Sequence, residues 1–305
     1  MAQCRHTPDE IDQPRVSDTP TASSSPNAGP LVGLHAAALL FGFAGLFGKW
    51  LALPPATIVF GRSAIACAAL ALLLRLFGER NARDPFEWRL AAGGAVLALH
   101  WVSFFQSIQI ASVAVGLLGC ASFPLFVLLL EWGMRQRGLR STEWLTAGLV
   151  TAGLVMIVPE FNVENRTVQG LAWGVVSGFT FALLTVNNRS LAARHAAGSI
   201  AMWQNGCAAL VLLPFIIAAP TVPSAREIGL LLVLGIACTA LSHTLFIRSL
   251  RVVSAHTASV VWALEPVYGI ALAFLLLGET PSLRTLAGGA LIIGAALFAT
   301  MRSFR

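Results

Sequence analysis

The sequence predicts an all-α integral membrane protein whose ten transmembrane helices form two inverted five-helix repeats. Three observations carry this prediction. The chain of 305 residues is 56% hydrophobic and 11% charged, whereas soluble domains contain roughly a quarter charged residues. Two segments in the two halves of the chain also match each other at a constant spacing. Finally, the arginines are distributed over alternate loops, as expected for helices that cross a bilayer in turn.

The first observation places the helices. From residue 31 onward, apolar runs of about twenty residues follow one another, each long enough to cross a hydrocarbon core of about 30 Å. The predicted spans are 31–51, 56–77, 88–108, 112–133, 142–159, 168–187, 198–218, 227–247, 256–277 and 283–301. Five spans precede the polar stretch 160–166 and five follow it. Because five is odd, the second half enters the membrane from the opposite face.

The second observation is the repeat, which is clearest at FFQSIQIAS (104–112) and FIRSLRVVS (246–254). At a constant offset of 142, the aligned pairs are Phe104 with Phe246, Ser107 with Ser249, Ser112 with Ser254 and Pro124 with Pro266. Many secondary transporters build a midplane binding site from repeats that cross the bilayer in opposite directions. The sequence therefore predicts a transporter.

The third observation orients the chain. With the N-terminus inside, the cytoplasmic loops hold most of the arginines: Arg75, Arg80, Arg83, Arg89, Arg135, Arg137, Arg140, Arg189, Arg194, Arg248, Arg251, Arg302 and Arg305. The outer loops hold only Arg166, Arg226 and Arg284. The positive-inside rule then places both termini in the cytoplasm. We expect a multi-pass protein of the bacterial inner membrane.

The chain divides into three parts. Residues 1–30 are rich in Pro, Ser, Thr and Asp and have no apolar stretch, which predicts a disordered cytoplasmic tail. The first five-helix repeat is predicted at 31–160 and the second, inverted one at 168–301.

Two motifs resemble a known family. The segment FGFAGLFGK (41–49), followed by Pro55 and Arg62, resembles the first hairpin of the drug/metabolite transporter superfamily, EamA branch. The segments LEPVY (264–268), LGE (277–279) and LAGGALI (286–292) are similar to its closing pair of helices. The resemblance covers residues 31–301, although Phe41 stands where the family often has tryptophan. It implies a ten-helix carrier with a central cavity, often an exporter of metabolites or amino acids.

Glu265 is the sharpest candidate for a substrate contact. It lies near the middle of the ninth predicted span, where an ionised carboxylate costs roughly 2.5–3.5 kcal/mol on insertion scales. Pro266 beside it removes a backbone donor and can free a carbonyl toward the cavity. A helix-packing carboxyl, protonated or paired with a histidine or hydroxyl, is the alternative.

Three ring side chains are further candidates. His100 and Trp101 lie near the middle of the third span, and His243, the repeat partner of Trp101, lies in the eighth. An imidazole can pair with a carboxylate substrate or exchange protons near neutral pH. An indole can stack on a planar or cationic substrate. Each of the three rings can instead serve only in packing.

The remaining predicted pathway residues are Gly42, Ser122 and Lys49. Gly42 belongs to a row of glycines that favours close helix packing or sliding. Lys49 and Arg62 are expected to flank the first outer turn, where each can attract anions or reach the headgroups by snorkelling. Glu131 and Glu279, at helix ends, are expected to be solvated or ion-paired.

Enzyme signatures are absent from the sequence: there is no HExxH, no Walker A motif and no pair of aspartates. The five cysteines lack CxxC spacing, so we expect free thiols, no metal and no cofactor. The arginines form no patch for nucleic acid. The leading hypothesis is a gradient-driven exporter of small metabolites, foremost amino acids, that works by alternating access. Its expected partners are the small-molecule substrate and membrane lipid, and a monomer is compatible with the sequence.

Three alternatives remain at this point. The first is a channel-like or purely structural membrane protein, and the second is a membrane enzyme. The third is a carrier of another solute class, such as drug-like cations or nucleotide-type metabolites.

Overall fold

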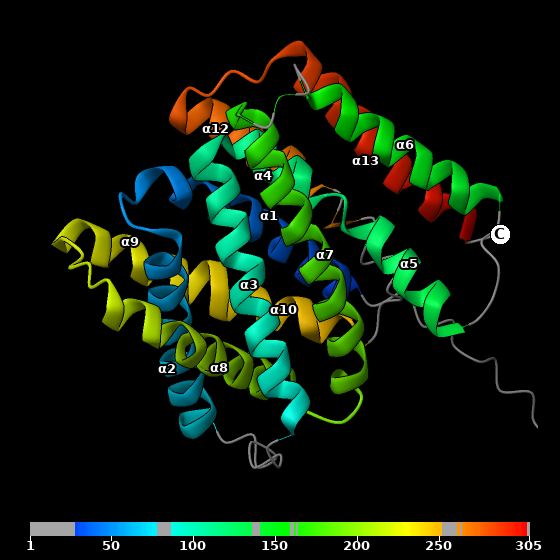
Figure 1. Cartoon of the computed structure of the whole chain (residues 1–305). Coiled ribbons are helices and arrows are strands. Elements are labelled where there is room, and N and C mark those ends of the chain that lie inside the picture. The colour runs from blue at the N-terminus through cyan, green and yellow to red at the C-terminus, as the bar shows by residue number, and fades with distance from the viewer. Residues whose placement is uncertain are drawn as a thin grey trace, which may run out of the picture.

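The computed structural model describes residues 28–77, 87–135, 141–158, 162, 164–251, 261–262 and 264–303. Within these ranges every regular element is a helix (Figure 1). The helices are α1 (Ala28–Trp50), α2 (Pro55–Phe77), α3 (Trp88–Ile110), α4 (Val113–Cys120), α5 (Phe123–Arg135), α6 (Ser141–Ile157), α7 (Arg166–Ala192), α8 (Ala197–Ala218), α9 (Ala225–Gly235), the π-helix η1 (Ile236–Leu241), α10 (Ser242–Ser249), α12 (Glu265–Leu277) and α13 (Leu283–Ser303).

Seven helical segments of the described chain are long and apolar enough to cross a membrane. They are Val32–Trp50, Pro55–Leu76, Trp88–Ile110, Val113–Met134, Arg166–Ala192, Ala197–Ala218 and Ala225–Ser249. Three shorter apolar helices, Trp144–Ile157, Glu265–Leu277 and Leu283–Ala295, occupy the positions of the fifth, ninth and tenth predicted spans. The all-helical class is confirmed.

The first helix begins earlier than predicted. α1 starts at Ala28, so residues 28–30 belong to a helix and not to the predicted tail. Residues 1–27, for which disorder is predicted, lie outside the described residues, as do residues 252–260 and 263 of the ninth predicted span.

The fourth span, predicted as one helix over 112–133, is broken. α4 ends at Cys120 and α5 begins at Phe123. Pro124 explains the break, because proline lacks an N–H and its ring clashes with the carbonyl four residues earlier. At the break, the Ser122 hydroxyl donates to the Gly119 carbonyl oxygen at 2.7 Å.

The ninth span differs from its prediction for the same reason. α12 begins at Glu265, with Pro266 in its first turn, where a missing N–H costs nothing. Glu265 is therefore the first residue of a helix. The prediction that it lies near the middle of a continuous span is wrong. Phe123 and Glu265, the residues at which α5 and α12 begin, are separated by the repeat offset of 142.

The eighth span, predicted as one uninterrupted helix over 227–247, contains a π-helical turn between α9 and α10. The Thr239 hydroxyl donates to the Leu234 carbonyl oxygen five residues earlier, at 2.7 Å. The Ser242 hydroxyl donates to the Cys238 carbonyl oxygen at 2.7 Å. These hydroxyls satisfy backbone acceptors where the regular helical pattern changes. Such π-turns occur frequently at functional sites.

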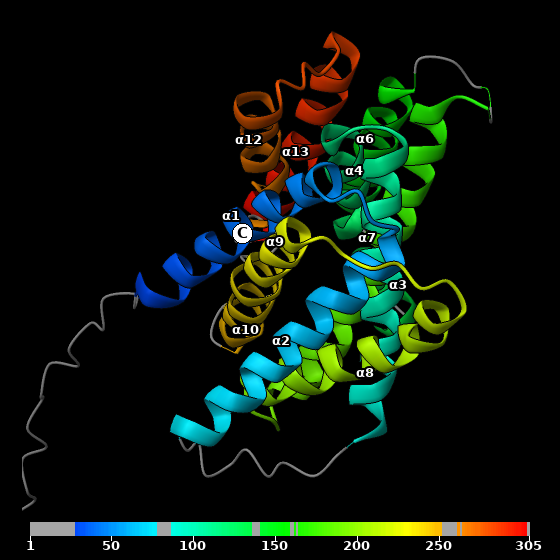
Figure 2. The ribbon, with the colours of Figure 1, turned by 90° about the vertical axis from the view of Figure 1, so that its left-hand side faces the viewer.

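The helices pack in a regular order. α3 packs on α7 and α8, α2 on α8, α1 on α10 and α12, α4 and α5 on α7, and α6 on α13. The α2–α8 pair and the α6–α13 pair lie at opposite ends of the molecule (Figures 1 and 2). The segments between these pairs enclose the buried centre, which is formed by helices of both halves of the chain.

Candidate functional site

A small cavity lies at the centre of the helices. It is lined by residues of α1, α2, α3, α4, α7 and α12 together with Trp262: Phe41, Ala44, Arg62, His100, Trp101, Phe104, Cys120, Phe181, Trp262 and Glu265. Its volume, counted as space for the centre of a water molecule, is about 20 Å³, which is room for about one water. The helices are therefore closed around this central cavity.

Aromatic rings form most of its wall. The ring centroid of Trp262 lies 4.6 Å from that of Phe181, 4.8 Å from Phe41 and 4.9 Å from Phe246. Such rings present negatively polarised faces that attract cations. The aromatic wall of the cavity is thus suited to contact with a positively charged group.

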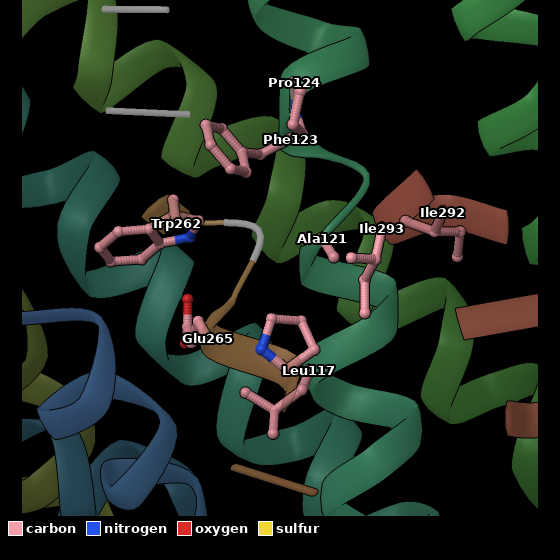
Figure 3. Close-up of a pocket in the computed structure, with 9 residues that line it drawn as sticks. Leu117, Ala121, Phe123, Pro124, Trp262, Glu265, Ile292 and Ile293 are labelled. Atoms are coloured by element: carbon pink, nitrogen blue, oxygen red, sulfur yellow. The ribbon is translucent and has the colours of Figure 1, made fainter. Parts of the chain in front are cut away.

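Glu265 is the acidic residue of the central cavity. Its side chain is 5% exposed, and its carboxyl makes no hydrogen bond or ion pair with any described residue. Figure 3 shows this carboxyl directed toward Trp262. Its place at the first residue of α12 favours a negative charge, because the N-terminal end of a helix carries a partial positive charge.

The breaks in the fourth and ninth spans meet beside Glu265. A second, smaller cavity of about 10 Å³ is lined by Phe123 and Pro124 from one break and by Trp262, Glu265 and Pro266 from the other (Figure 3). Glu265 therefore lies between two cavities, at the point where corresponding positions of the two halves approach each other.

Arg62 is the functional candidate that sequence reasoning misplaced. The prediction put it at the outer turn near the headgroups, but it is 1% exposed and lines the central cavity. Its Nε donates to Thr239 Oγ1 at 2.8 Å and its Nη2 to the Cys238 carbonyl at 3.1 Å. Its Cζ lies 4.0 Å from the Trp101 ring centroid. Arg62 lies two helical turns after the start of α2, which at 1.5 Å per residue is about 10 Å along the helix. This distance from the helix end could have indicated from the sequence that Arg62 is buried.

The predicted ring residues meet around Arg62. His100 lines the cavity, with Nδ1 2.9 Å from both the carbonyl oxygen and the hydroxyl of Ser177. Trp101 contacts Arg62 and also lies near His243, whose ring centroid is 6.0 Å from that of Trp101. His243 is buried, with Nδ1 3.4 Å from Asn205 Nδ2, and it is not one of the residues that line the cavity.

The three other predicted pathway residues have different positions. A Cβ on Gly42 would lie 2.9 Å from the Glu265 carbonyl oxygen, so Gly42 packs directly against the start of α12. Ser122 is buried in the break between α4 and α5. Lys49 lies apart from the cavity at the end of α1, where its Nζ donates to the Ala111 carbonyl oxygen at 3.0 Å.

One of the two acidic residues predicted at helix ends forms an ion pair, and the other accepts a backbone hydrogen bond. Glu131 lies 3.5 Å from Arg189 in an ion pair. Glu279 follows α12 and accepts a hydrogen bond from the backbone N–H of Val113 at 3.0 Å. Neither lines the central cavity.

Comparison with known proteins agrees with this arrangement. The EamA-like transporter family matches residues 29–158 and again residues 168–301. The chain is 31% identical over 247 residues to the pseudopaline exporter CntI of Pseudomonas aeruginosa, an alignment that covers 80% of this chain and 86% of that protein. It is 25% identical over 245 residues to the S-adenosylmethionine uptake transporter of Rickettsia conorii, covering 79% and 81% of the two chains.

A crystal structure 21% identical in sequence matches with a TM-score of 0.68 over 92% of this chain and 99% of that chain. This likeness shows a shared fold. Because the family matches both halves of the chain, this multi-pass membrane protein belongs to the EamA-like transporter family and is a transporter of small molecules, not an enzyme.

Proposed function

We propose that this protein is a secondary transporter that exports small metabolites, foremost amino acids, across the bacterial cytoplasmic membrane. The observation that carries the proposal is the presence of one basic and one acidic side chain, Arg62 and Glu265, on the wall of a single buried cavity. No described residue forms an ion pair with either side chain. In this proposal the substrate carries the two opposite charges that neutralise Arg62 and Glu265.

The chemistry of the wall favours a zwitterion. A guanidinium binds carboxylate through parallel N–H donors, and a carboxylate in an aromatic enclosure favours an ammonium group. An α-amino acid presents both groups within one small molecule. A nucleotide brings several negative charges that the Glu265 carboxylate would repel, and a simple cation would leave Arg62 without a counter-ion.

The packing of the helices supports alternating access between inverted halves. At the repeat offset of 142 residues, α7 corresponds to α1, α8 to α2, and α13 to α6. α1 packs on α10 and α12 of the other half, and its counterpart α7 packs on α3 and α5, which are the counterparts of α10 and α12 in the first half. The pairs α2–α8 and α6–α13 each join corresponding helices. This pattern is the one expected of two halves related by a pseudo-twofold axis, which can rock about a fixed site.

One of the comparisons supports export as the direction of transport. The relative with 31% identity is an exporter, whereas the uptake transporter shares 25%. Since the chain has no nucleotide-binding motif, a solute or proton gradient drives the movement. The arginine distribution supports a topology with both termini in the cytoplasm.

Transport by the purified protein in liposomes tests the proposal. Labelled amino acids are screened one by one, with and without a pH gradient, and flux is measured against concentration and against unlabelled competitors. We expect saturable, competed flux of at least one amino acid. Flux that rises linearly with concentration would indicate a channel, and the absence of flux for every amino acid would exclude this substrate class.

A further inference from the structure

Arg62, at the centre of the protein, has no counter-ion among the residues that the structure describes. A guanidinium has five N–H donors, and the described residues accept two hydrogen bonds from Arg62, both from the π-helix η1. No carboxylate of the described chain lies at ion-pairing distance from it. Removing such a charge from water is costly unless an anion compensates it. The remaining donors are available to a molecule in the central cavity, which Arg62 lines.

The surroundings of Arg62 fix its orientation in advance. Trp101 covers one face of the guanidinium at 4.0 Å, and the Phe105 ring centroid lies 5.5 Å from it. The Thr239 hydroxyl and the Cys238 carbonyl hold one edge, and Thr239 is itself held by its bond to the Leu234 carbonyl. A side chain locked by packing and by supporting hydrogen bonds binds a ligand with little further loss of entropy.

We infer that Arg62 is the carboxylate-binding and specificity-determining residue of the central cavity, with Glu265 holding the ammonium group of the same substrate. This inference rests on the proposed function and narrows its substrates to molecules with an α-amino carboxylate. The π-helix η1 serves to present Arg62, because its Cys238 carbonyl and Thr239 hydroxyl are the two acceptors that position the guanidinium.

Binding to the full-length protein in lipid nanodiscs tests this role. The twenty proteinogenic amino acids are screened first. Each one that binds is then compared with its decarboxylated amine and with the acid that lacks the amino group. For Arg62→Gln, we expect the affinity for the amino acid to fall at least about tenfold, as for loss of a charged hydrogen bond. The affinity for the amine should change little, and Arg62→Lys should recover part of the loss.

The outcomes separate this inference from the proposed function. If amino acids bind but Arg62→Gln weakens the amino acid and its amine equally, Arg62 has only a structural role and the inference is overturned. If no amino acid binds to the wild-type protein, the proposed substrate class itself fails. Unchanged thermal unfolding of Arg62→Gln, or of Arg62→Lys where the first variant does not fold, verifies that the binding result reports on the site.

A second inference follows from an independent set of contacts, which lie at the ends of the helices. At the predicted cytoplasmic end, Glu87 of the first half lies 3.2 Å from Arg194 and 3.1 Å from His195 of the second half. Arg251 also contacts the turn between α7 and α8. Its Nε donates a hydrogen bond to the Ala192 carbonyl at 3.0 Å, and its Nη2 donates one to the His195 carbonyl.

The hydrogen bond from Arg251 to His195 has a counterpart at the opposite end of the helices. Gln109 Nε2 donates to the Leu53 carbonyl at 2.9 Å. Arg251 and His195 lie 142 positions after Gln109 and Leu53, the same offset that aligns Phe104 with Phe246. The two contacts are therefore equivalent in the repeat, but the outer one is made by a neutral amide and the inner one by a guanidinium beside an ion pair.

The geometry points to a charged inner gate, made by Glu87, Arg194, His195 and Arg251, and a neutral outer gate, made by Gln109 and Leu53. Native Cys120, which lines the central cavity, reports on both gates when the other cysteines are replaced by serine. We expect Glu87→Gln to speed the labelling of Cys120 by a membrane-impermeant maleimide from the cytoplasmic side. We expect Gln109→Ala to speed the labelling from the outer side. Faster labelling from the same side in both variants, or no change in either, would overturn the assignment of the gates.

Discussion

Gly42 and Glu265 touch through their backbones, so that no side chain fits between α1 and α12. A Cβ on Gly42 would lie 2.9 Å from both the Glu265 carbonyl oxygen and the Gly269 backbone nitrogen. Backbone atoms cannot move aside as a flexible side chain can. This contact fixes the start of α12, and with it the Glu265 carboxyl, against the wall of the central cavity.

We therefore expect Gly42→Ala to destabilise the protein, by about 1–3 kcal/mol as for other overpacked sites. The measurement is the midpoint of thermal unfolding in detergent. Gly148→Ala is the matched control, because a Cβ at Gly148 would meet nothing within 4 Å. An equal midpoint for both variants would show that α1 and α12 can separate without cost.

The sequence was a good guide to the fold where hydropathy alone decides the structure. The starts of α2 and α3 agree with the predicted spans to within a residue. The spans that differed contain features that hydropathy does not register. Pro124 and Pro266 lie in the first turns of new helices, and the hydroxyls of Thr239 and Ser242 bond to backbone carbonyls at a π-turn.

Part of the site was predicted from the sequence, and part was not. Glu265, His100 and Trp101 were identified because polar and aromatic residues in an apolar span are expensive or specific, and all three line one cavity. Arg62 was misplaced because an arginine near a helix end usually snorkels. Its stacking on Trp101 and its bonds to Thr239 and Cys238 depend on residues distant in sequence, which only the fold brings together.

The proposed topology predicts opposite accessibility for two exposed residues. Val222, which is 91% exposed, lies in a predicted outer loop, and Ala193 lies in a predicted inner one. In a background without other cysteines, Val222→Cys should react with an impermeant maleimide added to intact cells. Ala193→Cys should react only after permeabilisation. Reaction of both from the same side would contradict the predicted crossing of the membrane by α8, which lies between them.

The ion pair of Glu87 with Arg194, at the predicted cytoplasmic end, predicts a pH dependence. The hydrogen bond from His195, together with Arg194, lowers the pKa of Glu87 from its ordinary value of 4.5. A carboxyl whose folded-state pKa is lowered contributes stability above its unfolded pKa and loses it as the pH falls through the folded value. As the pH falls from about 5 through the folded-state pKa of Glu87, we expect the unfolding temperature of the wild type to fall more than that of Glu87→Gln.

In that comparison the control is the acid-induced fall in the unfolding temperature of Glu87→Gln, because this variant retains every other carboxyl. Parallel curves for the two proteins would show that Glu87 contributes nothing through its charge. A steeper fall in the variant would reverse the sign derived from the lowered pKa.

The transport rate of Glu265→Gln tests the central claim most directly. Rates are measured in liposomes at matched protein content, across pH, for an amino acid that the wild type carries, with Glu131→Gln as the control carboxyl outside the cavity. Because the substitution removes a buried charge without a partner among the described residues, Glu265→Gln should insert and fold normally. Its rate should fall at least about tenfold, as for loss of one charged contact to the substrate, while Glu131→Gln stays near the wild type. A wild-type rate and pH profile for Glu265→Gln would contradict a substrate site at this carboxyl.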